Sequence, residues 1–271
     1  MQLQTERFAP HAYAILRIVT GVMFMMHGTQ KLFAWPGTKP RATAALQLTA
    51  GVIETVGGVM IALGLFASIA AFVASGTMAV AYFLRHAGTG EKFYPIVNKG
   101  ELAVLYCFVF LFIASAGSGR WSLDALRDRG TSAGATHTAP LLGRFNPQSF
   151  AVLRIVAGLL FAMHGTQKLF GWPGDTPPID VPMMRIAGTI ELVAGLLIAI
   201  GLAASFAAFI ASGLMAAAYF MKHAPQSFLP ILNAGELAVL FCFLWLYIAA
   251  AGAGRWSVDA MRNRGGVPRP M

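Results

Sequence analysis

The chain has 271 residues, of which 57% are hydrophobic and only 11% are charged, and its formal net charge is +9. Soluble domains carry about 25% charged residues, so this composition excludes an ordinary soluble domain and indicates a membrane protein. The basic residues are scattered among apolar runs, which favours anionic lipid headgroups over nucleic acid as their partner, while Cys107 and Cys242 form neither a CxxC pair nor a zinc spacing.

Eight apolar runs follow one another along the chain, each close to the length of about 20 residues that spans the hydrocarbon as a helix. The first four runs fall near residues 12–34, 43–64, 65–86 and 99–118. The other four fall near residues 149–171, 182–201, 202–223 and 234–253. These runs are too long for the strands of a barrel. We therefore predict an all-α integral membrane protein with eight transmembrane helices.

The second half of the chain repeats the first. The string MHGTQKLF occurs at residues 26–33 and again at 163–170, an offset of 137 residues that falls to 135 after the third run of each half. An internal period of this kind indicates two copies of one structural unit. The predicted parts are a first four-helix unit, a linker, a second four-helix unit and a tail, at residues 8–129, 130–147, 148–264 and 265–271.

The even number of spans in each unit fixes the relation between the units. Because four spans return the chain to its starting side, both units enter the membrane in the same direction. We therefore predict parallel repeats related by a pseudo-twofold axis along the membrane normal. A relative with one unit would then be a homodimer. A small excess of Lys and Arg near the span ends favours termini in the cytoplasm.

Polar side chains interrupt the apolar runs near one end of this predicted bundle. A charged side chain within a span is costly and usually faces the bundle interior, where it finds a partner. We therefore predict one polar ligand-binding pocket in each unit, open towards the outer face. Its candidate residues in the first unit are His27, Gln30, Lys31, Glu54, Tyr82, His86 and Glu101. In the second unit they are His164, Gln167, Lys168, Glu191, Tyr219, His223 and Glu236.

Several of these candidates also have a structural interpretation. His27 and Glu54 suit a buried pair that joins the first two helices, and Lys31 suits a side chain that reaches the membrane interface. Among the candidates, Glu54 and Glu191 give the strongest indication of a functional role, because a carboxyl group near mid-membrane is rare. Such a group suits a proton carrier or a hydrogen-bond donor to a ligand.

The remaining candidates have structural alternatives of their own. Tyr82 and His86 are of the residue types that anchor helices at the interface. Asn98 and Glu101 have the form of a helix N-cap with a Glu three residues later, and residues 233–236 repeat it. Capping explains this pattern at least as well as binding chemistry does.

The motifs resemble those of the DoxX family of bacterial membrane proteins. The matching stretches of the first unit are LRIVTGVMFMMHGTQKLF, GVIETVGGVMIALGL, NKGELAVLY and GSGRWSLD. The second unit repeats them as LRIVAGLLFAMHGTQKLF, GTIELVAGLLIAIGL, NAGELAVLF and GAGRWSVD. The resemblance covers nearly the whole chain twice and identifies it as a tandem fusion of two DoxX-like units. It implies a location in the bacterial inner membrane and an association with membrane redox systems, some of which pass electrons to quinone.

Four functions are compatible with this sequence. The first is a subunit of a membrane redox system that binds a quinone-like or small substrate, with other redox subunits and membrane lipid as partners. The second is a transporter or permease for a small solute, and the third is a non-catalytic scaffold or assembly factor. The fourth is a metal site, for which His27, Glu54, His86 and Glu101 are weak candidates. We assign no catalytic residue and expect no nucleic-acid partner.

Overall fold

The computed structural model describes residues 6–38, 40–87, 94–130, 139–174 and 177–264, and every regular element within them is a helix. The first unit begins with a 3₁₀ turn at Glu6–Phe8, and its helices are α1 (Ala9–Phe33), α2 (Ala45–Leu63), α3 (Ala67–Arg85), α4 (Glu101–Ala116) and the short α5 (Leu123–Gly130). The second unit begins with a 3₁₀ turn at Gly143–Phe145, and its helices are α6 (Asn146–Phe170), α7 (Pro182–Ile200), α8 (Ala204–Ala218), a π-helical turn at Tyr219–His223, α9 (Glu236–Ala251) and α10 (Val258–Arg264).

These helices follow the predicted apolar runs closely. Helix α6 begins at Asn146, two residues before the predicted start of the second unit at residue 148. Residues 131–138 of that linker, and the predicted tail at 265–271, lie outside the described residues.

Six helical segments are long and apolar enough to cross a membrane. They are Glu6–Phe33, Ala45–Leu63, Ala67–Arg85, Gly143–Phe170, Pro182–Ile200 and Ala204–His223. The other two apolar helices, α4 and α9, have 16 residues each and so are about 24 Å long. The protein is therefore an all-helical membrane protein over the part of the chain that is described.

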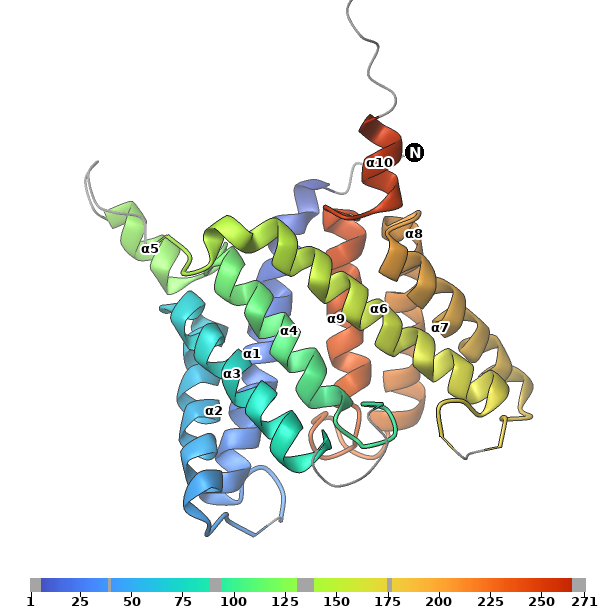
Figure 1. Ribbon diagram of the computed structural model, residues 1–271. Helices are drawn as coiled ribbons and strands as arrows, with labels where there is room; N and C mark the ends of the chain where they lie inside the picture. The colour runs from blue at the N-terminus through green and yellow to red at the C-terminus, as the bar shows by residue number, and fades with distance from the viewer. Residues whose placement is uncertain (1–5, 39, 88–93, 131–138, 175–176, 265–271) are drawn as a thin grey trace, which may run out of the picture.

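The ends of the helices gather at two opposite sides of the molecule (Figure 1). The short helices α5 and α10 lie on the side of the N-terminus, whereas the loops that follow α1, α3, α6 and α8 lie on the other side (Figure 1). The end of α1 and the beginning of α4 therefore come to the same side, together with their counterparts in the second unit. This side holds the polar residues of the MHGTQKLF segments.

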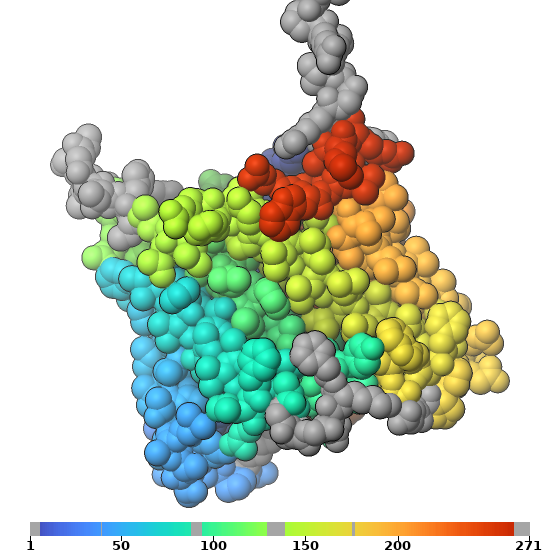
Figure 2. Space-filling model, in the orientation of Figure 1, coloured from blue at the N-terminus to red at the C-terminus, as the bar shows by residue number. Residues whose placement is uncertain are grey.

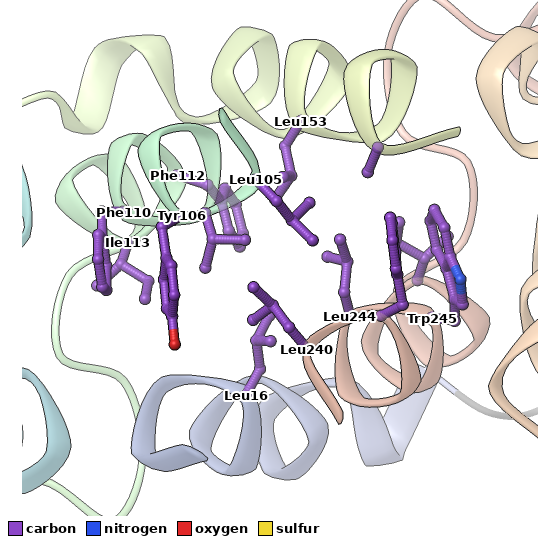
Figure 3. Packing of buried hydrophobic residues seen from close by; sticks show 14 of the residues in the cluster. Leu16, Leu105, Tyr106, Phe110, Phe112, Ile113, Leu153, Leu240, Leu244 and Trp245 are labelled. Atoms are coloured by element: carbon purple, nitrogen blue, oxygen red, sulfur yellow. The ribbon is translucent and has the colours of Figure 1, made fainter. Parts of the chain in front are cut away.

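The interface between the units is formed by one pair of helices from each. Helix α1 packs against α9, and α4 packs against α6. Figure 3 shows leucines and aromatic rings from these four helices meeting in one apolar core. Helices α2 and α3 pack on one flank of these four helices, and α7 and α8 pack on the other, and all four contribute buried residues to the same core. Figure 2 shows the consequence at the surface, where the blue-to-green first unit and the yellow-to-red second unit lie side by side.

Within each unit, glycines allow the first two helices to approach until their backbones touch. A Cβ atom on Gly58 of α2 would lie 2.5 Å from the backbone nitrogen of Met25 in α1. On Gly28 of α1 a Cβ atom would lie 2.4 Å from the backbone nitrogen of Thr55. Small residues permit such close packing in a membrane, where lipid tails give apolar side chains no advantage in associating. This contact brings the last turns of α1 against the middle of α2.

A buried arginine fixes the opposite end of the same helix pair. Arg17 is fully buried, and its Nη1 donates to the carbonyl oxygens of Ile61 and Ala62 at 2.6 and 2.7 Å. Its Nη2 donates to the carbonyl oxygen of Trp121 at 2.7 Å. The last carbonyl groups of a helix have no partner within the helix, so Arg17 satisfies the end of α2 and holds the segment before α5. Arg154 makes the equivalent bonds in the second unit.

Candidate ligand-binding site

The centre of the candidate site is an ion pair between α1 and α2. Lys31 donates to the carboxylate of Glu54, which is 3% exposed. The close packing of the two helices at Gly28 places this carboxylate within reach of the lysine one turn further along α1. Lys168 and Glu191 form the same pair in the second unit. Glu54 therefore pairs with Lys31, and the predicted structural pair between His27 and Glu54 is not formed.

A second set of ion pairs joins the two units. His27 of the first unit lies 2.7 Å from Glu236 of the second, measured from Nε2 to Oε1. His164 of the second unit lies 2.8 Å from both carboxylate oxygens of Glu101 in the first. The prediction that His27 and Glu101 belong to one pocket within a unit is therefore wrong. The physical reason is the packing of α4 on α6 and of α9 on α1, which turns each glutamate towards the histidine of the other unit.

The residues after α3 form a separate polar cluster around Asn98. His86 Nδ1 lies 2.9 Å from the carbonyl oxygen of Asn98, and the Asn98 amide donates to Tyr82 Oη at 3.3 Å. The Asn98 side-chain oxygen accepts from the backbone nitrogen of Gly100 at 2.9 Å. Because α4 begins at Glu101 with Gly100 as its N-cap, Asn98 lies two residues too early to cap it. The predicted capping box is wrong.

The second unit has the equivalent cluster around Asn233. His223 Nδ1 lies 2.9 Å from the carbonyl oxygen of Asn233. Tyr219 Oη donates to the carbonyl oxygen of Phe228 at 2.6 Å. Helix α9 begins at Glu236 with Gly235 as its N-cap, so the capping prediction is wrong here too. Tyr219 and His223 thus hold the connection between α8 and α9.

The two candidate glutamines support loops. Gln30 is buried and donates from Nε2 to the carbonyl oxygen of Pro36 at 2.9 Å. Gln167 donates in the same way to Pro173 at 3.3 Å. Both glutamines therefore hold the Trp-Pro-Gly segment that follows their own helix.

A cavity of about 640 Å³ lies beside the Lys31–Glu54 pair in the first unit. Four helices contribute to its wall, namely the end of α1, the first half of α2, the second half of α3 and the start of α4. Most of the wall is apolar. The polar side chains that reach it are His27, Lys31, Gln47, Thr49, Glu54, Thr77, Arg85, His86, Lys99 and Tyr106. We call this cavity the first-unit pocket.

The part of the first-unit pocket formed by α2 and α3 lies far from the turn that joins these two helices. A three-residue turn at 64–66 joins these helices at one end, whereas the lining residues come from the other end. Leu46 of α2 and Leu84 of α3 line the pocket and are 59% and 58% exposed. The rim therefore presents apolar side chains at the flank of the bundle.

The weak metal candidates are not brought together. Among the described residues no group of three or more His, Cys, Asp or Glu side chains has the geometry to hold a metal ion. Glu101 bonds to His164 and His27 bonds to Glu236, so the four candidates do not form one cluster of metal ligands.

Six polar residues of the first-unit pocket were not among the predicted candidates, namely Gln47, Thr49, Thr77, Arg85, Lys99 and Tyr106. Lys99 precedes α4, and Tyr106 lies in α4. A signal for both is present in the sequence, because the second unit has Ala234 and Phe241 at the corresponding positions.

Comparison with known proteins gives a consistent result. The family model described as DoxX matches twice, at residues 12–87 and 149–224. An uncharacterized protein of Haemophilus influenzae is 45% identical over 124 residues, which cover 44% of this chain and 92% of that relative. A single unit thus accounts for nearly all of the relative. No solved structure matches the chain significantly.

Proposed function

This chain belongs to the DoxX family, and we propose that it binds a small lipid-soluble ligand of the quinone type in the first-unit pocket, as a subunit of a bacterial membrane redox system. The observation that carries the proposal is the pocket itself. Its volume of about 640 Å³ lies in the range of about 300–1,000 Å³ that is usual for small-molecule sites. An apolar wall with a few fixed polar groups is also typical of such sites.

The rim of the pocket supports entry from the hydrocarbon. Leu46 and Leu84 are exposed at the flank of the bundle, where lipid tails surround a membrane protein. A ligand dissolved in the membrane can pass between α2 and α3 without crossing water. The exposed leucines at the rim therefore favour a ligand with a large apolar part, such as a quinone.

The polar side chains suit the oxygens of a quinone ring. A quinone carries two carbonyl oxygens that accept hydrogen bonds on an otherwise apolar ring. The Lys31 ammonium has three donor protons, of which one is directed at Glu54. A second can bind a quinone oxygen. Glu54 lies beside it and exchanges one of the two protons that accompany two-electron reduction of the ring, and the redox partner that supplies the electrons exchanges the other.

Electron exchange requires a second protein in this proposal. The sequence has no haem-attachment motif, flavin loop or CxxC pair. The ligand would therefore receive or lose its electrons at another redox subunit of the membrane, while this chain holds the ring. In this proposal the chain exchanges a proton with the ligand through Glu54 and transfers no electrons itself.

The proposed arrangement in the membrane has eight spans. Helices α4 and α9 complete the six longer segments, because both are apolar and both lie in the core between the units. The units, at residues 8–129 and 148–264, run parallel and are related by a pseudo-twofold axis along the membrane normal. The matching contacts of α1 with α9 and of α6 with α4 support this symmetry. We place both termini in the cytoplasm, with the pockets towards the outer face and lipid around the flanks.

Binding of a defined quinone tests the proposal. Ubiquinone-1, which has one isoprene unit, would be titrated by calorimetry into the purified full-length protein in lipid nanodiscs. We expect saturable binding that Glu54→Gln weakens about tenfold, because Lys31 loses the carboxylate that positions its ammonium group for a charged hydrogen bond to the quinone. Glu6→Gln, which removes a charge at an exposed position, is the matched control and should bind like the wild type. Absence of saturable binding by the wild type contradicts the proposed ligand.

The redox role needs a separate test in cells. The ratio of quinone to quinol would be measured in extracted membranes of a deletion strain whose other redox proteins are intact. We expect this ratio to shift. An unchanged ratio would remove the redox role while leaving the binding result in place.

One observation favours a second function, that of a membrane scaffold. The two His–Glu pairs tie the units to each other, which is what a purely structural role requires. On this alternative, His27→Ala lowers the free energy of unfolding and changes no response to ubiquinone-1.

A further inference from the structure

The hydroxyl group of Tyr106 has no hydrogen-bond partner among the described residues, although the side chain is 1% exposed. Its ring stacks on Phe110 with centroids 5.3 Å apart and meets His27 edge-on. Figure 3 shows the ring projecting from α4 with its oxygen directed towards α1. Buried tyrosine hydroxyls usually find a partner, and leaving such a group unpaired is costly. Tyr106 is one of the residues that line the first-unit pocket.

The second unit differs from the first at the positions that line this pocket. The residues corresponding to His27, Lys31, Glu54 and His86 are identical in both units. Five other polar lining residues of the first unit are Gln47, Thr49, Thr77, Lys99 and Tyr106. Their counterparts in the second unit are Met184, Ile186, Leu214, Ala234 and Phe241. Every one of these five changes replaces a polar side chain with an apolar one.

The Tyr106 hydroxyl has no partner among the described residues, and the second unit lacks polar side chains at the corresponding positions. We therefore propose that Tyr106 donates a hydrogen bond to a carbonyl oxygen of the bound ligand, and that only the first unit binds this ligand. The inference rests on the proposed function and deepens it. The ligand lies between Tyr106 and the Lys31–Glu54 pair, with one carbonyl oxygen towards each. The second unit then serves to complete the fold, and it supplies Glu236 to hold His27.

Two unpartnered atoms of the second unit do not replace the missing hydroxyl. Glu191 Oε2 is buried without a partner, but an ionised carboxylate accepts hydrogen bonds, and so does a quinone oxygen. Trp245 Nε1 is also buried without a partner, and it can donate. However, Trp245 corresponds to Phe110, which does not line the first-unit pocket. Its indole therefore lies one helical turn beyond the equivalent of the site.

A reciprocal exchange of residues between the units tests this inference. Ubiquinone-1 would be titrated by calorimetry into the full-length wild type, Tyr106→Phe and Phe241→Tyr in lipid nanodiscs. We expect one quinone per chain for the wild type. Tyr106→Phe should weaken binding about fivefold, the typical effect of one neutral hydrogen bond, and Phe241→Tyr should leave the affinity unchanged. The midpoint of thermal unfolding without ligand should not fall in Tyr106→Phe, because the hydroxyl has no partner to lose.

The possible outcomes separate this inference from the proposed function. If the wild type binds but Tyr106→Phe binds equally well, the role of Tyr106 is wrong and the proposed function stands. Two equal sites per chain, or a site lost in Glu191→Gln and kept in Glu54→Gln, would overturn the assignment to the first unit. Absence of binding by the wild type overturns the proposed function itself. A lower unfolding midpoint for ligand-free Tyr106→Phe would show that the hydroxyl is structural.

Discussion

The ion pair between His27 and Glu236 makes a quantitative prediction about how the two units are coupled. Its atoms are 2.7 Å apart, and the two side chains are 28% and 13% exposed. A buried hydrogen bond to a charged group contributes about 1.5–3 kcal/mol, and the partial exposure of His27 reduces this through solvent screening. We therefore expect a coupling free energy of about 1–2 kcal/mol for this pair.

A double-mutant cycle measures this coupling directly. The free energy of unfolding in mixed detergent micelles would be determined by SDS titration for the wild type, His27→Ala, Glu236→Gln and the double variant. The matched control is the cycle of His27→Ala with Glu101→Gln. Since Glu101 is bonded to His164, the two control substitutions should add to within about 0.5 kcal/mol. A larger coupling of His27 to Glu101 than to Glu236 would refute the arrangement of α1 on α9.

Two further substitutions test the packing that positions the site. Gly58→Ala should lower the free energy of unfolding by about 1–3 kcal/mol, because the new Cβ would meet the backbone of α1. Gly57→Ala is the control and should raise the free energy of unfolding by about 0.5–1 kcal/mol, because nothing lies within 4 Å of its Cβ position. Equal effects of the two substitutions in the same SDS titration would contradict the helix contact. Arg17→Met should lower the free energy of unfolding by at least about 2 kcal/mol, because it leaves buried carbonyl groups without a partner. The exposed Arg41→Met is the control and should change the free energy of unfolding by no more than about 0.5 kcal/mol. An unchanged unfolding midpoint for Arg17→Met would show that the hydrogen bonds of Arg17 contribute no net stability.

The helices were predictable because their signals are local. A run of apolar residues that ends in Gly64 or Gly201 marks the end of a helix wherever the rest of the chain lies. The convergence of His27, Lys31 and Glu54 near one end also follows from the alternating direction of consecutive spans. Position along a span predicts the depth of a side chain and leaves its facing direction undetermined.

The pairing of Glu101 could not be predicted because it depends on the direction that a side chain faces. The partner of Glu101 depends on which side of α4 packs against α6, and α4 is too uniformly apolar for its periodicity to indicate a side. Asn98 was misread as a cap because Lys99, at φ 60°, places an additional turn before the helix. Tyr106 could have been found by aligning the two units and asking where they differ in polarity.

A structure of the protein with ubiquinone-1, determined in lipid nanodiscs, tests the central claim most directly. We predict planar density in the first-unit pocket between Tyr106 Oη and Lys31 Nζ, with a tail leaving between Leu46 and Leu84. A first-unit pocket that stays filled only by protein side chains at saturating quinone would contradict the account.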